Sequence, residues 1–246
     1  MAKLINGHLR GSIGDLTYRK TKHGTIVSRK VGSNKDHFNN SPTMENARHN
    51  ATEFTYSARA ASVIRSSLHG FLHIYETEGH NRLLRLIHKA LKYDTIHRPG
   101  ARILTPEAAR NLVGFELSDK SHLCDHLKFA FDFHHFVEYG TASVLVESFH
   151  TGWFMNAPSG ATHFHLKLIS INIDLNEPKA VSTCDTSQMV PLGGETGDII
   201  LEETELLEDK SQIFALALEY FQRVNGTYYP VARAHPPCRI IHTHIL

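Results

Sequence analysis

Long stretches in which apolar and polar residues alternate constrain the fold of this chain most. Residues 162–175, THFHLKLISINIDL, alternate in this way, with apolar side chains at Phe164, Leu166, Leu168, Ile171 and Ile173. Further strand candidates are residues 143–149, 198–207, 213–221, 228–234 and 238–246, with 128–137 as an additional one. Asn225-Gly226 joins two of them, and this dipeptide is the strongest short hairpin signal. Strands of this length separated by turns predict an antiparallel β-sandwich of the immunoglobulin-like kind.

The first 40 residues show a different pattern, which is basic and spaced by glycines. The segment GSIGDLTYRKTKHGTIVSRKV, residues 11–31, alternates around Lys22-His23-Gly24 and predicts a β-hairpin. Because Gly7, Gly11 and Gly14 precede this hairpin, the first fifteen residues are expected to form a loop or a flexible edge strand. Residues 32–40 have the composition of a linker.

Helices are expected between the hairpin and the predicted sandwich. Ser41-Pro42-Thr43 predicts a helix start, with Ser41 as N-cap, and an apolar stripe continues from there to Leu72. A second helix is expected from about residue 79 to 93, and a short third one over 105–112. The expected class is therefore α+β: a basic hairpin and linker (1–40), a helical region (41–113) and an antiparallel β-sandwich (114–246).

Charge divides the chain in nearly the same place. Residues 1–110 contain 18 basic and 8 acidic side chains, whereas residues 111–246 contain 8 basic and 17 acidic ones, although the whole chain has a formal net charge of only +1. Such asymmetry indicates a charged partner or a complementary surface. Two domains with different solvated faces would give the same pattern.

The N-terminal motifs carry a family resemblance. Eight positions follow the family's order of glycine-spaced basic segment, second glycine element and helix start: Gly11, Gly14, Tyr18, Gly24, Arg29, Pro42, Thr43 and Arg48. This order resembles an uncharacterised domain-of-unknown-function family common in Bacteroidota, and residues 213–232 resemble that family's last hairpin. The resemblance implies architecture at both ends of the chain, and it implies no activity.

Nineteen histidines make metal binding a hypothesis to weigh. The pairs with ligand-like spacing are His122/His126, His163/His165 and His242/His244, with His235 and Cys238 as further donors. Structural zinc sites need four converging ligands, usually with closer, thiol-rich spacing. The pattern therefore favours scattered histidines, and no metal or other cofactor is expected.

Catalytic motifs are absent from the sequence. It contains no GxSxG, Walker or HExxH pattern. Gly193-Gly194 lacks the lysine of a phosphate loop and is interpreted as a turn. We therefore expect a protein that is not an enzyme.

The function that the sequence favours is self-association, as a structural or interaction protein in a larger particle or filament. The residues expected to make contact are Tyr18 and the basic side chains of Arg19, Lys20, Lys22, Arg29 and Lys30. The acidic counterpart is Glu202, Glu203, Glu205, Glu208 and Asp209. The alternative is nucleic-acid binding by the basic hairpin and helices, since each basic side chain could neutralise a phosphate.

Cysteine usage and hydropathy bear on the compartment. Cys124, Cys184 and Cys238 form no CxxC pair, so a disulfide framework is not expected and a reducing compartment fits best. No apolar run reaches the roughly 18 residues of a membrane-spanning helix. We expect cytoplasmic synthesis, with the final location in an assembled particle left open.

Overall fold

The chain forms two compact units, residues 1–48 and residues 49–246. The computed structural model describes residues 3–5, 7–21, 23–29, 35–72, 79–207, 209–231 and 236–246. Helices and mostly antiparallel sheets make up the described part, which confirms the α+β class. The boundary expected at residue 113 runs through the larger unit, in which helices and sheets share one core.

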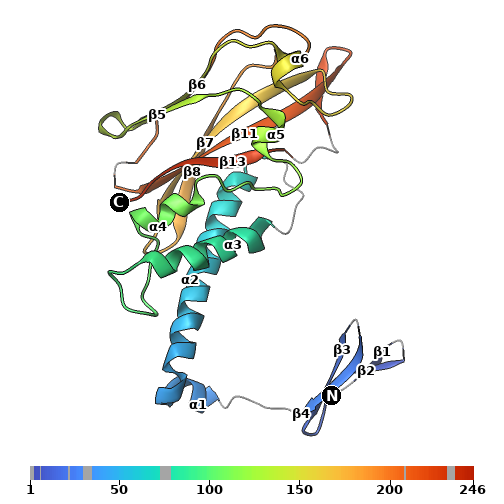
Figure 1. Cartoon of the computed structure of the whole chain (residues 1–246), viewed down its shortest axis with the longest axis vertical. Coiled ribbons are helices and arrows are strands. Elements are labelled where there is room, and N and C mark those ends of the chain that lie inside the picture. The colour runs from blue at the N-terminus through green and yellow to red at the C-terminus, as the bar shows by residue number, and fades with distance from the viewer. Residues whose placement is uncertain are drawn as a thin grey trace. The chain divides into compact units, whose positions relative to one another are not determined.

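The smaller unit is built around a four-stranded antiparallel sheet in which each strand pairs with its chain neighbour (Figure 1). Its elements are β1 (Lys3–Ile5), β2 (His8–Ile13), β3 (Leu16–Thr21), β4 (Gly24–Arg29), α1 (Lys35–Asn40) and η1 (Pro42–Met44). The expected hairpin is confirmed as β3 and β4. The segment before it contributes two further strands, and Gly14 turns the chain between β2 and β3 with a φ of 54°.

The predicted helices are present. They are α2 (Glu45–His69), α3 (Gly79–Ala90), η2 (Leu91–Tyr93), α4 (Pro106–Ala109) and η3 (Arg110–Leu112), followed by the short turns α5 (Leu123–His126), η4 (Val137–Tyr139) and α6 (Thr151–Phe154). Ser41 has the extended backbone of an N-cap, with Pro42 at the first helical position. Thr105 caps α4 by accepting a hydrogen bond from the backbone N–H of Ala108 at 3.4 Å.

Two antiparallel sheets form the rest of the larger unit. One has the order β10-β6-β5, and the other has the order β12-β11-β7-β8, with β13 also pairing to β11 and β9 to β7. The strands are β5 (Asp132–Phe136), β6 (Thr141–Val146), β7 (His163–Asp174), β8 (Lys179–Thr186), β9 (Val190–Pro191), β10 (Ile199–Glu203), β11 (Ser211–Val224), β12 (Thr227–Pro230) and β13 (Cys238–His244). The Asn-Gly turn is confirmed, with φ values of 50° at Asn225 and 85° at Gly226.

The strands β7 and β11 at the centre of the larger sheet are buried on both faces over most of their length. Ile169, Ile171 and Ile173 of β7 pack against α2, α3 and α4 on one face. On the other face, Leu166 and Leu168 pack against the inward side chains of β6 and β10. Figure 1 shows this order of layers, with the helices on one side of β7 and β11 and the β5-β6 hairpin on the other. Among the described residues, no helix is long and apolar enough to cross a membrane.

Candidate interaction surfaces

The N-terminal sheet has one apolar and one polar face. Residues paired directly across an antiparallel ladder share a face, so the pairs Leu4–Leu9, Ile13–Leu16 and Tyr18–Val27 stand on the same side. Lys20, Thr25 and Arg29 complete this side, which we call the apolar face. The opposite side, the polar face, presents Arg10, Ser12, Thr17, Arg19 and Ser28 among the described side chains, with Ile26 as an apolar member.

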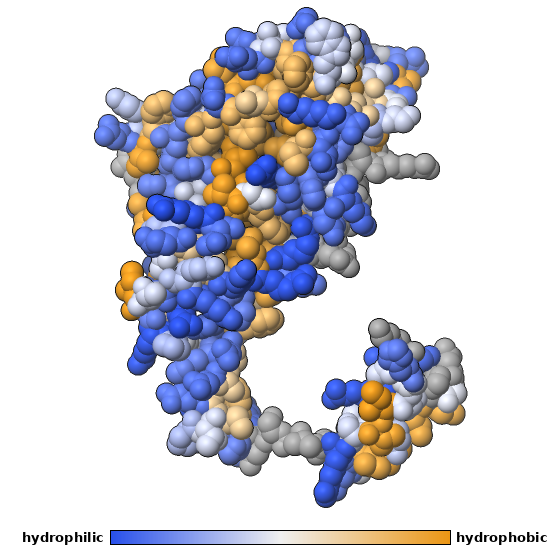
Figure 2. Space-filling model, in the orientation of Figure 1, coloured by the Kyte–Doolittle hydropathy of each residue, from blue (hydrophilic) through white to orange (hydrophobic). Residues whose placement is uncertain are grey.

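The apolar face is open to solvent. The exposed fractions are 71% for Leu4, 51% for Ile13, 42% for Leu16 and 51% for Val27. Figure 2 shows apolar side chains gathered on this sheet. None of the described side chains of the sheet is buried, so within its own unit the sheet has no core. A small sheet needs a covered apolar face to be stable, and this one has the side chains for such a contact.

The basic residues expected to make contact are divided between the two faces. Lys20 and Arg29 flank Tyr18 and Val27 on the apolar face, whereas Arg19 stands on the polar face. Lys22 and Lys30 lie outside the described residues. The structure thus brings two of the expected cations and Tyr18 onto one surface.

The acidic residues expected to receive them do not form one surface. Glu202, Glu205 and Asp209 are exposed, and Glu208 lies outside the described residues. Glu203 points inward and is only 4% exposed. It therefore does not belong to the accessible acidic surface that the sequence predicts.

Glu203 is held by two hydroxyl groups. Its Oε2 accepts hydrogen bonds from Oγ1 of Thr183 and, at 3.4 Å, from Oγ of Ser170. Burial raises the pKa of the Glu203 carboxyl above its usual range. These contacts tie β10 to β7 and β8, which makes Glu203 a structural residue of the sheet–sheet contact.

A second cluster of polar side chains, formed by histidines from two strands, lies between the two sheets of the larger unit. His135 of β5 lies with its ring centroid 5.8 Å from that of His242 and 5.2 Å from that of His244, both on β13. Burial first, and then the two neighbouring histidines, lower the pKa of His135 to about 4. The sequence identifies His242 and His244 as a same-side pair, but it gives no signal that His135 faces them.

In the other histidine pairs that the sequence identified, the members described next contact non-histidine side chains. His126 contacts Ser121, whereas Nδ1 of His122 lies 3.7 Å from the Asp125 carboxylate. His165 Nε2 lies 2.8 Å from the Glu219 carboxylate. In the part of the chain that the structure describes, no three His, Cys, Asp or Glu side chains are placed to hold a metal ion. His235 lies outside the described residues.

Ser121 and His126 have the hydrogen-bond order of a nucleophile and its base. Ser121 Oγ lies 3.0 Å from His126 Nε2, while Nδ1 of His126 lies 2.9 Å from the carbonyl oxygen of Asn156. Because that carbonyl can only accept, Nδ1 carries the proton and Nε2 accepts from Ser121. Ser121 is only 6% exposed, so the pair fixes this segment against its neighbours and offers no accessible nucleophile.

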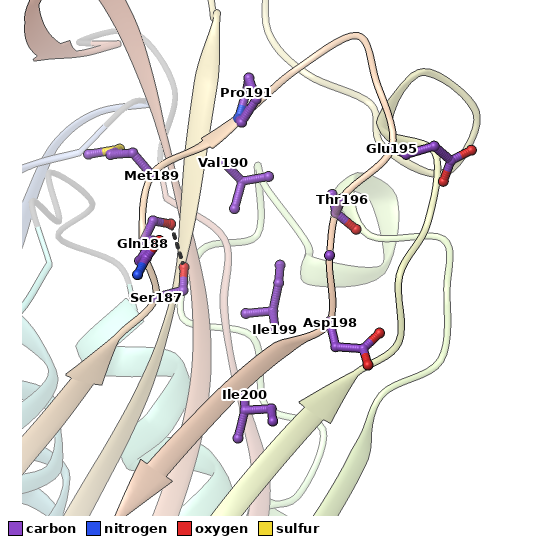
Figure 3. A pocket seen from close by; sticks show the side chains of 11 residues that line it. Ser187, Gln188, Met189, Val190, Pro191, Glu195, Thr196, Asp198, Ile199 and Ile200 are labelled. Carbon is purple, nitrogen blue, oxygen red and sulfur yellow. Dashed lines mark hydrogen bonds between the residues drawn. The ribbon is translucent and has the colours of Figure 1, made fainter.

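One cavity, of about 500 Å³, opens between residues 187–191 and 195–200 (Figure 3). The side chains of Val190 and Ile199 point into the space between the two segments, and that of Glu195 points away from it. The polar groups here have structural partners, since Asp198 accepts from the N–H of Ser148 at 2.9 Å and Thr196 accepts from that of Phe149 at 3.0 Å. Among the described residues that line the cavity there is no His, Cys, Lys or Arg.

Comparison with known proteins gives no relative: no family model, curated protein or solved structure matches the chain. The resemblance to the Bacteroidota family therefore rests on the N-terminal and C-terminal motifs alone.

Proposed function

We propose that this chain is a non-enzymatic structural or interaction protein that self-associates through the apolar face of its N-terminal sheet. The observation that carries the proposal is the exposure of Leu4, Ile13, Leu16 and Val27 on one side of a sheet without a core. Burying apolar surface is favourable by about 25 cal/mol per Å². A second copy that covers this face would stabilise the sheet and the assembly together.

The size of the face favours an assembly of many copies over a tight dimer. Four strands about 4.8 Å apart and up to six residues long cover roughly 400 Å². Specific interfaces typically bury about 800 Å² on each partner. A single contact of this size is weak, and repetition along a particle or filament would strengthen it through high effective concentration.

We also propose that the two sheets of the larger unit are an immunoglobulin-like scaffold. The strand orders β5-β6-β10 and β8-β7-β11-β13 support it. The hairpin β5-β6 lies within the first sheet, and the hairpin β7-β8 lies within the second. The chain passes from one sheet to the other after β6, between β9 and β10, and after β10, as in sandwiches of that kind. A rigid scaffold of this type suits a protein that presents surfaces to neighbours.

Nucleic-acid binding is the second candidate. The polar face supports it, because Arg10 and Arg19 stand there together with the hydroxyl groups of Ser12 and Thr17. Cations and hydroxyls of this kind contact phosphates. The two candidates use opposite faces of one sheet, so substitutions can separate them.

Sedimentation velocity tests the proposed function. The full-length chain should form oligomers that grow with protein concentration, and a variant lacking residues 1–34 should remain monomeric with an unchanged thermal transition. Nuclease treatment should leave the oligomers intact. A full-length chain that stays monomeric at low salt and high concentration would refute self-association, and oligomers dispersed by nuclease would favour the nucleic-acid candidate.

A further inference from the structure

The sheet β10-β6-β5 also has an outer face that is open to solvent. Direct pairing places Ile200, Leu145 and Asp132 in one row, and Glu202, Ser143 and His134 in the next. Phe136 follows at the end of β5, opposite Thr141. The inward side chains of the same strands, Val144, Val146 and Leu201, are buried. We call this side of the sheet the acidic outer face.

Apolar side chains are unusually exposed on and beside the acidic outer face. Ile200 is 58% exposed, Phe136 50% and the adjoining Tyr139 77%. Each would lose contact with water beneath a partner of matching shape, and exposed apolar patches rimmed by polar residues mark interaction sites. Burial in an interface would therefore be favourable both for this face and for the apolar face of the N-terminal sheet.

The charges of the two faces are complementary. Residues 132–147 and 198–203 contain six carboxylic side chains and no Lys or Arg. On the outer face itself these are Asp132 and Glu202, which are both exposed. Residues 3–29 contain six basic side chains and one acidic one. Lys20 and Arg29 are the basic members of the apolar face.

We infer that the apolar face of the N-terminal sheet docks onto the acidic outer face of the β10-β6-β5 sheet of a second copy. The inference rests on the proposed function, for which it names the partner surface. Apolar burial around Leu16 and Val27 supplies the attraction. Pairing of Lys20 and Arg29 with Asp132 and Glu202 sets the orientation, because exposed charge pairs guide approach more than they add affinity.

This contact is heterologous, since it joins two different surfaces. Each copy keeps one surface free after the first contact, so assembly continues to a ring or a filament. Contact between two identical apolar faces would instead stop at a dimer, and it would bring the cations of both copies into one interface. Charge therefore favours the heterologous arrangement.

Two reversed-charge variants test the inference. The first, K20E/R29E, makes the docking face acidic, and the second, D132K/E202K, makes the receiving face basic. Each variant alone should assemble at least about tenfold more weakly than the natural chain, since attraction at two pairs becomes repulsion. An equimolar mixture should regain assembly with the two variants alternating, because every contact then joins opposite charges.

A matched control uses acidic residues outside the strands of the outer face. Glu107 of α4 and Glu177 between β7 and β8 are both exposed. The variant E107K/E177K carries the same change in net charge and should assemble like the natural chain. If D132K/E202K shows a lowered melting temperature, D132N/E202Q removes the charges without adding new ones and should weaken assembly less.

The outcomes separate this inference from the proposed function. If D132K/E202K assembles like the natural chain, the acidic outer face is not the receiving surface. If deletion of residues 1–34 still abolishes assembly in that case, self-association through the N-terminal sheet remains supported. A mixture that fails to regain assembly would also overturn the pairing of these two faces. Dispersal of the natural assembly by nuclease would overturn both.

Discussion

Tyr18 lies directly opposite Val27 in the register of β3 and β4, on the apolar face of the N-terminal sheet. This pair lies at the centre of the apolar face, between Leu16 and Lys20 along β3. Because none of the sheet's described side chains is buried, its hydrogen bonds have little packing to protect them. The stability of β3 and β4 should therefore depend on what covers this pair.

Hydrogen exchange gives the first prediction. Amide protection in β3 and β4 should rise with protein concentration, since association covers their apolar side. The amides of β7 and β11 should be insensitive to concentration, because their strands are buried on both faces. Equal protection of β3 and β4 across a wide concentration range would contradict the account.

Acid sensitivity of the larger unit is the second prediction. The pKa of His135 lies at about 4 in the folded chain, against 6.5 as its ordinary value. The unfolded chain therefore binds a proton at His135 before the folded chain does as the pH falls. As a result, the free energy of unfolding carries no penalty from His135 above about pH 6.5, and it declines as the pH falls toward 4. The phenylalanine variant H135F keeps the ring packing and removes the titration.

Thermal unfolding at pH 7 and pH 5 checks this prediction. The melting temperature of H135F should fall less between the two values than that of the natural chain. His126, His163 and His242 also have lowered pKa values, so some dependence remains. His134 is exposed on the other side of β5, and H134F should behave like the natural chain. Equal pH dependence in H135F and H134F would show that His135 is not the titrating group.

The third prediction concerns Asp94, which organises the loop after α3 and η2. Its carboxylate accepts from the backbone N–H groups of Ile96, His97 and Ile103 at 2.9 to 3.1 Å, and its Oδ2 lies 2.7 Å from Nδ1 of His97. The side chain is fully buried. D94A should lower the free energy of unfolding by roughly 2–4 kcal/mol, since buried donors lose their acceptor.

Chemical denaturation measures that loss, and D209A at an exposed position serves as the control. Burial alone would raise the pKa of Asp94, but the hydrogen bonds from His97 and Ile103 outweigh it and lower the pKa to about 2. The contribution of Asp94 should therefore be complete above about pH 4 and be lost toward pH 2. A D94A variant as stable as D209A would refute the structural role.

Sequence patterns predicted the elements with strong periodicity and missed those without it. The alternation of β7 and the Asn-Gly turn after β11 located the central sheet. The strand β8, residues 179–186, was missed because it has few apolar side chains: it is an edge strand whose interior contacts include the hydroxyl of Thr183. Strands β1 and β2 were only partly foreseen, since glycines interrupt their pattern.

The candidate surfaces could not be predicted from the sequence of single strands, because they depend on how the strands pair. Alternation within residues 16–29 identified a hairpin, but only the register of β2 against β3 placed Ile13 beside Leu16. Glu202 and Glu203 are neighbours in the sequence and lie on opposite sides of β10. Asp132 joins Glu202 on one surface only because β5 and β10 both pair with β6.

The most direct test of the central claim compares two neighbouring residues of β4 by sedimentation velocity. Val27 on the apolar face and Ile26 on the polar face are 51% and 54% exposed, so V27K and I26K each replace a β-branched apolar side chain by lysine at sites of nearly equal exposure. The account predicts that V27K stays monomeric at concentrations at which I26K and the natural chain form oligomers. The same oligomer distribution for V27K and the natural chain would contradict it.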